Sequence, residues 1–366
     1  MVLKKLLLNL WFLVKRACGK PFKSKLLYYE TYKIILGTLK YKKLRRIVGQ
    51  TTHIIFFRGA TGDTYFQFLL LNEYLKENKI KNFVVAGDSA NLMALADIFR
   101  CSNVFFVPYL EYIEKAYLFY NGKNMNVLFP FCWADNFYFN KCRIRMTEKY
   151  NFMDTYRYFA FKLKNSVFDY RKFNFNKTNE TSIFSWESQG IIKDRTILIA
   201  PDANSVTKLP IWFWNGIIKE LQAFGYTVFM NCFYPTFFRA PNLFTSYKSA
   251  VPMLEYAGAF IGVRSGFCDI ISSAKCKKII LYPKIQDELN LDKHRSEVEY
   301  SGLTVMGLYQ GEDLKEISTP LLRNITDKEY MLSGTDDYFN AIETLRKQIM
   351  ENFKEVQNVS ITNQSS

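Results

Sequence analysis

Short apolar runs alternate with amphipathic stretches in the first part of the chain. The runs at 53–57 (HIIFF), 82–87 (NFVVAG) and 103–108 (NVFFVP) are bounded by polar or glycine-bearing turns, as buried strands are. The stretches between them, 64–80 and 89–99, carry apolar residues at helical spacing. Strands that alternate with helices through short connections predict a parallel sheet covered by helices.

The same alternation restarts after a polar, turn-rich segment at 174–182, which we interpret as a linker. The region before this linker has few clean periods, apart from a helix predicted over 147–165 and a strand end near 128–133. Beyond it, strands are predicted at 195–201, 226–232, 259–263 and 279–282, and helices at 212–225, 246–258, after 266 and within 327–354. The chain therefore predicts two α/β halves.

These patterns predict four parts of the chain. They are a basic amphipathic N-terminal segment (1–50), a first α/β domain (51–182), a second α/β domain (183–326), and a C-terminal helical region with a polar tail (327–366). A length of 366 residues suits two domains of ordinary size. A hydrophobic fraction of 49% with 23% charged residues is typical of a globular protein and excludes a disordered one.

The net charge of +15 is concentrated at the N-terminus. Residues 1–50 contain 13 of the 49 lysines and arginines but only one acid, Glu30. The rest of the chain is therefore nearly neutral. A neutral body without a known recognition module argues against a nucleic-acid partner.

The N-terminal segment begins like a signal peptide, but it has no small-residue cleavage site. Its apolar run, Leu6 to Val14, is too short to cross a bilayer. A basic helix with Trp11 and Phe12 suits an anionic membrane surface, at about 1 kcal/mol per basic residue. We predict that residues 1–46 dock on such a surface, in the cytoplasm at the inner face of the cell membrane. The alternative is a helix packed on the body with a solvated basic face.

Cysteine and histidine usage limits the chemistry. The seven cysteines are scattered without a C-x-x-C, and the only histidines are His53 and His294. This pattern excludes a zinc or disulfide framework and predicts a reduced, cytosolic setting. The chain has neither G-x-G-x-x-G nor G-x-x-x-x-G-K-[ST], which excludes a dinucleotide fingerprint and a P-loop. No Asp-x-Asp occurs in a strand-end loop, so we predict no metal and no cofactor.

Two glycine-bearing loops, 58–63 (RGATGD) and 264–269 (RSGFCD), follow predicted strands. Ligands of open parallel sheets bind beyond the carboxyl ends of the strands. The surrounding stretches, 58–76, 199–221 and 263–274, resemble motifs of the bacterial heptosyltransferase-like family of GT-B glycosyltransferases. That family has Gly-Asp after its first strand, then Pro, small polar residues and Lys before a later helix, and finally Asp-Thr/Ser-Gly-x-x-His.

The resemblance spans about 53–283 and implies a GT-B-like α/β fold, with two Rossmann-like domains whose parallel sheets face a central cleft. The first domain would hold the acceptor and the second a nucleotide-sugar donor, which is a co-substrate rather than a cofactor. Arg264 stands where the family usually has an acid, and Asp269 stands where it has a histidine. These departures predict a donor other than ADP-heptose, with Arg264 adding a contact to phosphate.

A departing nucleoside diphosphate must be stabilised, here by basic side chains and backbone N–H groups. Arg264 would pair with phosphate, Ser265 would donate a hydroxyl, and Gly266 would admit the helix N-terminus closely. Lys208 would add a point charge. Structural alternatives stay open for each: an ion pair for Arg264, an N-cap for Ser265, a solvated loop position for Lys208, and a helix-favouring first-turn position for Asp269.

The acceptor hydroxyl needs a base, and the resemblance places that role on Asp63, the acid of the first Gly-Asp. The alternative for Asp63 is a cap of the following helix. The predicted substrate contacts are Arg58, Gly59, Thr61, Gly62, Asp202, Asn204, Ser205, Lys208, Arg264, Ser265, Gly266, Phe267 and Asp269.

The sequence thus predicts an inverting, metal-independent glycosyltransferase. Its acceptor would be a glycan, lipid-linked, in the synthesis of a bacterial surface polysaccharide such as capsule, O-antigen or lipopolysaccharide. Two alternatives remain. One is another group transferase on a similar fold, such as a pyruvyl transferase. The other is a non-catalytic protein that binds a nucleotide or a partner.

Overall fold

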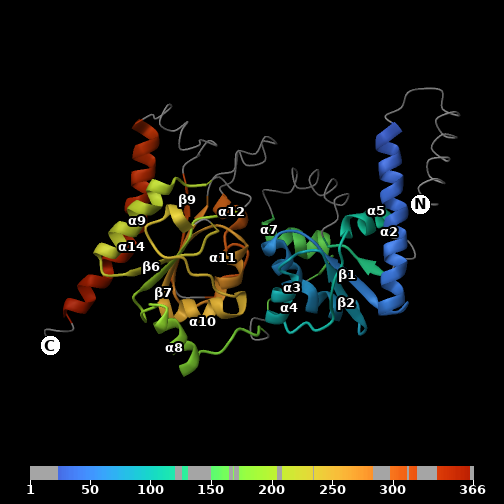
Figure 1. Cartoon of the computed structure of the whole chain (residues 1–366), viewed down its shortest axis with the longest axis horizontal. Coiled ribbons are helices and arrows are strands. Elements are labelled where there is room, and N and C mark those ends of the chain that lie inside the picture. The colour runs from blue at the N-terminus through green and yellow to red at the C-terminus, as the bar shows by residue number, and fades with distance from the viewer. Residues whose placement is uncertain are drawn as a thin grey trace.

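The structure is a computed structural model in which two parallel sheets lie side by side with helices around them (Figure 1). It describes residues 24–119, 126–130, 150–164, 168, 173–203, 208–233, 235–282, 297–310, 313–319 and 336–362.

The first sheet has the order β3-β2-β1-β4, and all its pairings are parallel. Its strands are β1 (His53–Phe57), β2 (Phe83–Gly87), β3 (Val104–Phe106) and β4 (Val127–Leu128). The helices of this half are α2 (Ser24–Val48), α3 (Thr61–Glu77), α4 (Leu92–Ile98), α5 (Leu110–Phe119), α7 (Phe152–Asp154) and the π-helical turn η1 (Thr155–Ala160).

The second sheet has the order β6-β5-β7-β8-β9, again with parallel pairings throughout. Its strands are β5 (Thr196–Ala200), β6 (Thr227–Met230), β7 (Gly258–Val263), β8 (Lys277–Tyr282) and β9 (Leu314–Ser318). The helices of this half are α8 (Glu180–Ser188), α9 (Ile211–Ala223), η3 (Pro235–Phe237), α10 (Tyr247–Ala257), α11 (Gly266–Ile270), η4 (Ile271–Ser273), α12 (Glu297–Ser301) and α14 (Asp336–Thr362).

These strand orders confirm the predicted α/β class with two parallel, Rossmann-like sheets. Successive strand residues face opposite sides of a sheet, so both sides of β1 are buried. Ile54 and Phe56 pack towards α2 and α5, whereas Ile55 and Phe57 pack towards α3 and α4. In the second half, α9 and α14 pack on one side of the sheet, and α10 and α11 on the other.

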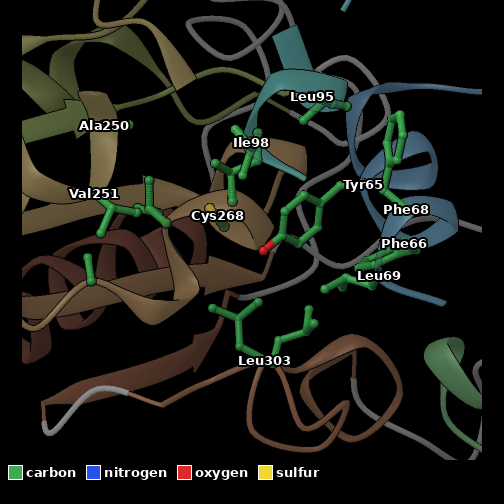
Figure 2. Close-up of a cluster of buried hydrophobic side chains, with 14 of the residues drawn as sticks. Tyr65, Phe66, Phe68, Leu69, Leu95, Ile98, Ala250, Val251, Cys268 and Leu303 are labelled. Carbon is green, nitrogen blue, oxygen red and sulfur yellow. The ribbon is translucent and has the colours of Figure 1, made fainter. Parts of the chain in front are cut away.

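The largest buried cluster joins the two halves, because α3 and α4 pack against α10 and α11 (Figure 1). Figure 2 shows its centre, where Tyr65 of α3 approaches Cys268 of α11 and Leu303 of the segment after α12. Leu95 and Val251 belong to the same cluster, from α4 and α10. The order across the molecule is therefore helices, sheet, two inner helix layers, sheet and helices.

Several predictions for single elements were wrong. The segment 174–182 is not only a linker, because α8 begins at Glu180, with the Asn179 side chain accepting from the Ser182 N–H as an N-cap. The described part of the helix predicted over 147–165 is a short helical turn followed by the π-helical turn η1. For the C-terminal region 327–354 we expected a helix pair or one broken helix; its described part is one continuous helix, α14, and residues 327–335 lie outside the described residues.

Helix α2 packs along α5 rather than standing free. The Cβ of any side chain at Gly37 would overlap the Tyr112 carbonyl, so glycine allows the two backbones to touch. Buried Arg45 donates to the carbonyl oxygens of Asn126 (2.6 Å) and Thr52. For α2 the packed alternative is therefore observed. The apolar run Leu6 to Val14 lies outside the described residues, and none of the described helices has the length and apolar composition to span a bilayer.

Candidate functional site

The carboxyl ends of strands at topological switch points are where open α/β sheets bind ligands. In the first sheet the strand order reverses at β1, and in the second it reverses between β5 and β7. Arg58 to Gly62 form the loop after β1 and the first residues of α3, Asp202 and Lys208 lie in the loop after β5, and Arg264 to Gly266 form the loop after β7 and the first residue of α11. The predicted site residues therefore follow the switch-point strands of both sheets.

The loops after β1 and β7 are in direct contact. A Cβ at Gly266 would lie 2.9 Å from the Cα of Gly62, and a Cβ at Gly62 would lie 2.8 Å from Oδ2 of Asp269. A Cβ at Gly266 would also lie 2.4 Å from the N of Gly62, and real Cβ atoms do not approach backbone so closely, so position 266 requires glycine. At Gly62 the closest neighbour of a Cβ would be the Asp269 side chain, and the Cα of Gly266 would follow at 3.2 Å. The neighbour that Gly266 admits in this structure is thus the backbone of Gly62 in the other half.

Asp63 occupies the first turn of α3 and both its carboxylate oxygens accept hydrogen bonds. The backbone N–H of Ala60, the N-cap residue, donates to Oδ2 (3.0 Å), and the hydroxyl of Tyr156 donates to Oδ1 (2.7 Å). Gly59 has φ +113°, a conformation that favours glycine, and a Cβ at this position would lie 2.6 Å from the Cβ of Asp63. A larger residue at position 59 would therefore overlap Asp63. The predicted N-cap role of Asp63 is wrong by position, because the N-cap of α3 is Ala60 and Asp63 is the third helical residue. Its two hydrogen bonds leave acceptor positions on the carboxylate unused.

Burial raises the pKa of Asp63 above its usual range. The Tyr156 hydrogen bond, the Ala60 N–H and the charge of Arg264 act in the opposite direction and lower this pKa. The net direction is upward, which makes the carboxylate a stronger base than an exposed aspartate.

Arg264 and Asp269 form a buried ion pair. Nη2 of Arg264 lies 2.6 Å from Oδ1 of Asp269, and the two side chains are 12% and 2% exposed. Arg264 also donates to the carbonyl oxygens of Ser265 (2.7 Å) and Ser301 (3.2 Å). Burial raises the pKa of Asp269 to about 6, against the lowering effect of the Arg264 charge. The ion-pair alternative for Arg264 is thus the arrangement observed.

The other predicted residues of the first half lie around the same strand end. Arg58 forms an ion pair with buried Glu114 of α5. The Thr61 hydroxyl accepts from the side-chain amide of Asn91 (2.6 Å), which precedes α4. Both contacts tie the loop after β1 to neighbouring elements.

On the donor side, Nζ of Lys208 lies 3.3 Å from Oδ1 of Asp202, and the Lys208 side chain is 66% exposed. Ser265 is the N-cap of α11 by position, although its side chain makes no capping hydrogen bond. Phe267 packs against Phe260 and Tyr247. Asn204 and Ser205 lie outside the described residues.

Sequence reasoning missed Tyr156, which contacts Asp63 from 93 positions along the chain. It also missed Asp88, which follows β2 and whose pKa is raised by burial against the charge of Arg58. The strand-end position of Asp88 was a signal that could have found it. No signal in the sequence links Tyr156 to Asp63. Within the described residues, no group of three or more His, Cys, Asp or Glu is placed to hold a metal ion.

Solved structures that are similar to this chain include three transferases. The glycosyl transferase family 9 protein from Veillonella parvula DSM 2008 has 12% sequence identity and a TM-score of 0.47, over 81% of this chain and 97% of its own. The E. coli ADP-heptose lps heptosyltransferase II has the same identity and TM-score, over 81% and 100%. The E. coli heptosyltransferase WaaC with ADP has 11% identity and a TM-score of 0.43, over 82% and 99%.

The sequence matches no protein-family profile and no curated protein. The strand orders and the parallel pairings of the two sheets define the α/β fold of this protein.

Proposed function

We propose that this protein is a metal-independent glycosyltransferase that moves a sugar from a nucleotide sugar to a glycan acceptor. The observation that carries the proposal is the meeting of the two switch-point loops. The first turn of α3, after β1, brings a carboxylate, Asp63, and the loop after β7 brings a cation, Arg264. A second cation, Lys208, follows β5, the strand paired with β7. Such a junction has a base on one side and positive charge on the other, as sugar transfer from a diphosphate requires.

In the reaction, the acceptor hydroxyl gives its proton to the Asp63 carboxylate as its oxygen attacks the anomeric carbon. The bond from that carbon to the diphosphate breaks, a glycosidic bond forms, and the nucleoside diphosphate leaves with the electron pair. Attack from the face opposite the leaving group inverts the anomeric centre. The upward pKa shift that burial gives Asp63 favours this proton transfer.

The leaving diphosphate would be stabilised chiefly by Lys208. Its ammonium group is exposed and bound to one carboxylate, Asp202, which a phosphate can replace. Arg264 instead holds Asp269 and two carbonyl oxygens, so a phosphate contact requires it to exchange one of these partners. We assign it the second donor contact, together with Ser265 and the backbone at Gly266.

The proposed acceptor is a lipid-linked glycan of a bacterial surface polysaccharide, such as capsule, O-antigen or lipopolysaccharide. The basic N-terminal segment supports this assignment, because an anionic membrane surface would hold the enzyme where such acceptors are displayed. Lys42, Lys43 and Arg46 of α2 are exposed and available for this contact. The enzyme would then work at the inner face of the cell membrane.

The test is a panel of nucleotide sugars, screened by thermal shift and then by release of the nucleoside diphosphate. We expect one donor to raise the melting temperature and to be turned over. Asp63→Asn should then lower the turnover by about 10²- to 10⁴-fold while donor binding persists. Asp313→Asn is the matched control and should turn over normally, because Asp313 directly precedes β9, at the amino end of that strand, whereas the candidate site lies beyond the carboxyl ends of the strands.

Two outcomes would contradict the proposal. If no nucleotide sugar shifts the melting temperature, the donor assignment fails. If a nucleotide binds without turnover in the presence of acceptor glycans, the protein is a binding protein instead. If Asp63→Asn turns over the donor at the parental rate, Asp63 is not the base.

A further inference from the structure

The carboxylate of Asp63 receives a hydrogen bond from an element to which the sequence assigned no role. The hydroxyl of Tyr156 lies 2.7 Å from Oδ1 of Asp63, and Tyr156 belongs to the π-helical turn η1. Single π-helical turns are rare and occur frequently at functional sites. The position of this hydroxyl is therefore set by an unusual backbone geometry.

Tyr156 is held in place from several directions. Its side chain is buried, and its ring packs against Phe66 of α3 (5.8 Å between ring centroids) and Phe152 of α7 (5.6 Å). The N–H of Phe161 donates to the Tyr156 carbonyl (2.9 Å), which closes the five-residue π turn. Because the ring and the backbone are both held, the hydroxyl oxygen of Tyr156 is kept beside the Asp63 carboxylate.

The segment that carries Tyr156 is also bound to the second half of the molecule. The side-chain amide of Asn151 donates to the Val305 carbonyl (2.9 Å). The same Asn151 caps α7 by accepting from the Asp154 N–H (2.9 Å). The hydroxyl at Asp63 is therefore fixed relative to both halves.

We propose that Tyr156 is a positioning residue for Asp63, holding the carboxylate in its charged form and in one orientation towards the acceptor hydroxyl. The inference rests on the proposed role of Asp63 as the base. Two hydrogen bonds occupy two of about four acceptor positions on a carboxylate, and the others remain for the substrate.

The electrostatic surroundings of Asp63 support this role. Among the described residues, the charged or titratable groups that face it are Tyr156 from η1, Arg264 from the loop after β7 and Asp269 from α11. Burial raises the pKa of Asp63, and the Tyr156 hydrogen bond is the largest influence that lowers it. Without this hydroxyl the pKa of Asp63 moves further up, and a larger fraction of the base is protonated at low pH.

The test is Tyr156→Phe, which keeps the ring and removes only the hydroxyl. We expect the acid limb of the kcat/KM profile to move to higher pH, so that the rate on this limb falls about tenfold more than on the plateau. Tyr74→Phe is the matched control. It removes another buried hydroxyl from the same region, one that contacts His53 (3.2 Å) near the other end of α3, and should leave the profile unchanged.

A second measurement does not depend on activity. The Asp63 carboxyl is titrated by carbon-13 NMR, with Asp63→Asn to identify its signal, and we expect its midpoint to rise in Tyr156→Phe. If Tyr156→Phe does not fold, 3-fluorotyrosine at position 156 keeps the ring and makes a stronger donor, so the midpoint should fall. An unchanged Asp63 midpoint in these variants would overturn the inference. A shifted midpoint in a protein that turns over no nucleotide sugar would support the contact while the proposed function fails.

Discussion

At the scale of single residues, the pair of Arg264 and Asp269 combines a large desolvation penalty with a close contact. Charges removed from water are costly unless paired, so breaking such a pair from one side leaves an uncompensated buried charge. Asp269 is the more deeply buried partner, and burial raises its pKa to about 6. The protonation of Asp269 therefore decides how costly the loss of its partner is.

Arg264→Met should destabilise the protein by about 3–5 kcal/mol at about pH 8, because Asp269 is then a buried carboxylate without a cation. Burial raises the pKa of Asp269 in the folded protein to about 6, so this carboxyl is mostly uncharged below that pH and charged above it. The destabilisation caused by Arg264→Met therefore grows as the pH rises above about 6. Removing the arginine charge moves this pKa further up. Urea unfolding at about pH 5 should therefore show a smaller loss than at about pH 8.

The matched control is the double variant Arg264→Met with Asp269→Leu, which removes both charges from the same site. Replacing a buried pair by apolar groups is often close to neutral, so this variant should regain most of the lost stability. An Arg264→Met loss that is equal at both pH values would mean that Asp269 does not carry the penalty.

At the scale of elements, the sequence predicts those strands that are continuous apolar runs buried on both sides. β1, β2, β5 and β7 are of this kind. β9 (LKEIS) was missed because it is an edge strand with one buried residue, Ile317, and therefore shows no apolar run. Periodicity reports local burial, and β9 has little of it, unlike the edge strand β6, which has three buried residues of four and was predicted.

Of the candidate site, too, only the features that are local in the sequence were predicted. The loops after β1 and β7 were found because glycine and polar residues directly follow apolar strands. The contact between Gly62 and Gly266 and the hydrogen bond from Tyr156 to Asp63 were not found, since they depend on how separate elements pack. The sequence left both a phosphate contact and an ion pair open for Arg264, and packing selected a pair with Asp269.

Helix α2 also makes the membrane prediction testable without disturbing the fold. Leu44 and Arg45 are buried, so deleting the segment would open the core, whereas Lys42, Lys43 and Arg46 are exposed. Reversing these three charges to glutamate should weaken binding to vesicles of anionic lipid. At about 1 kcal/mol for each basic residue, the affinity should fall on the order of a hundredfold.

The matched control reverses three exposed lysines of the second half, Lys219, Lys275 and Lys315, which changes the net charge equally. This control should bind anionic vesicles nearly as well as the parent, and vesicles of neutral lipid should bind neither protein. Equal weakening by both triple variants would show that net charge, and not the α2 surface, governs the attraction.

At the scale of the whole molecule, the two α/β halves share one hydrophobic core. Residues of α3 and α4 pack against α10, α11 and the segment after α12, and Tyr65, Cys268 and Leu303 lie at the centre (Figure 2). At its edge, Nζ of Lys248 lies 2.8 Å from Oδ2 of Asp97, which links α10 to α4. Separating the halves would expose this apolar surface to water, at about 25 cal/mol for each Å².

The shared core predicts that the two halves unfold together. Domains with separate cores and a small polar interface give separate transitions, whereas a continuous core couples both sheets into one cooperative unit. Differential scanning calorimetry should therefore show one transition, with a calorimetric enthalpy close to the van't Hoff enthalpy.

Gly266→Ala, which forces the α3 and α11 backbones apart, should lower the midpoint of that single transition, with a loss of about 1–3 kcal/mol in the free energy of unfolding. Gly216→Ala in α9 is its control, since there the added methyl meets only the flexible Arg346 side chain. Two resolved transitions in the parent protein would show that each half folds on its own and that the contact at Gly62 is a docking surface between independent domains.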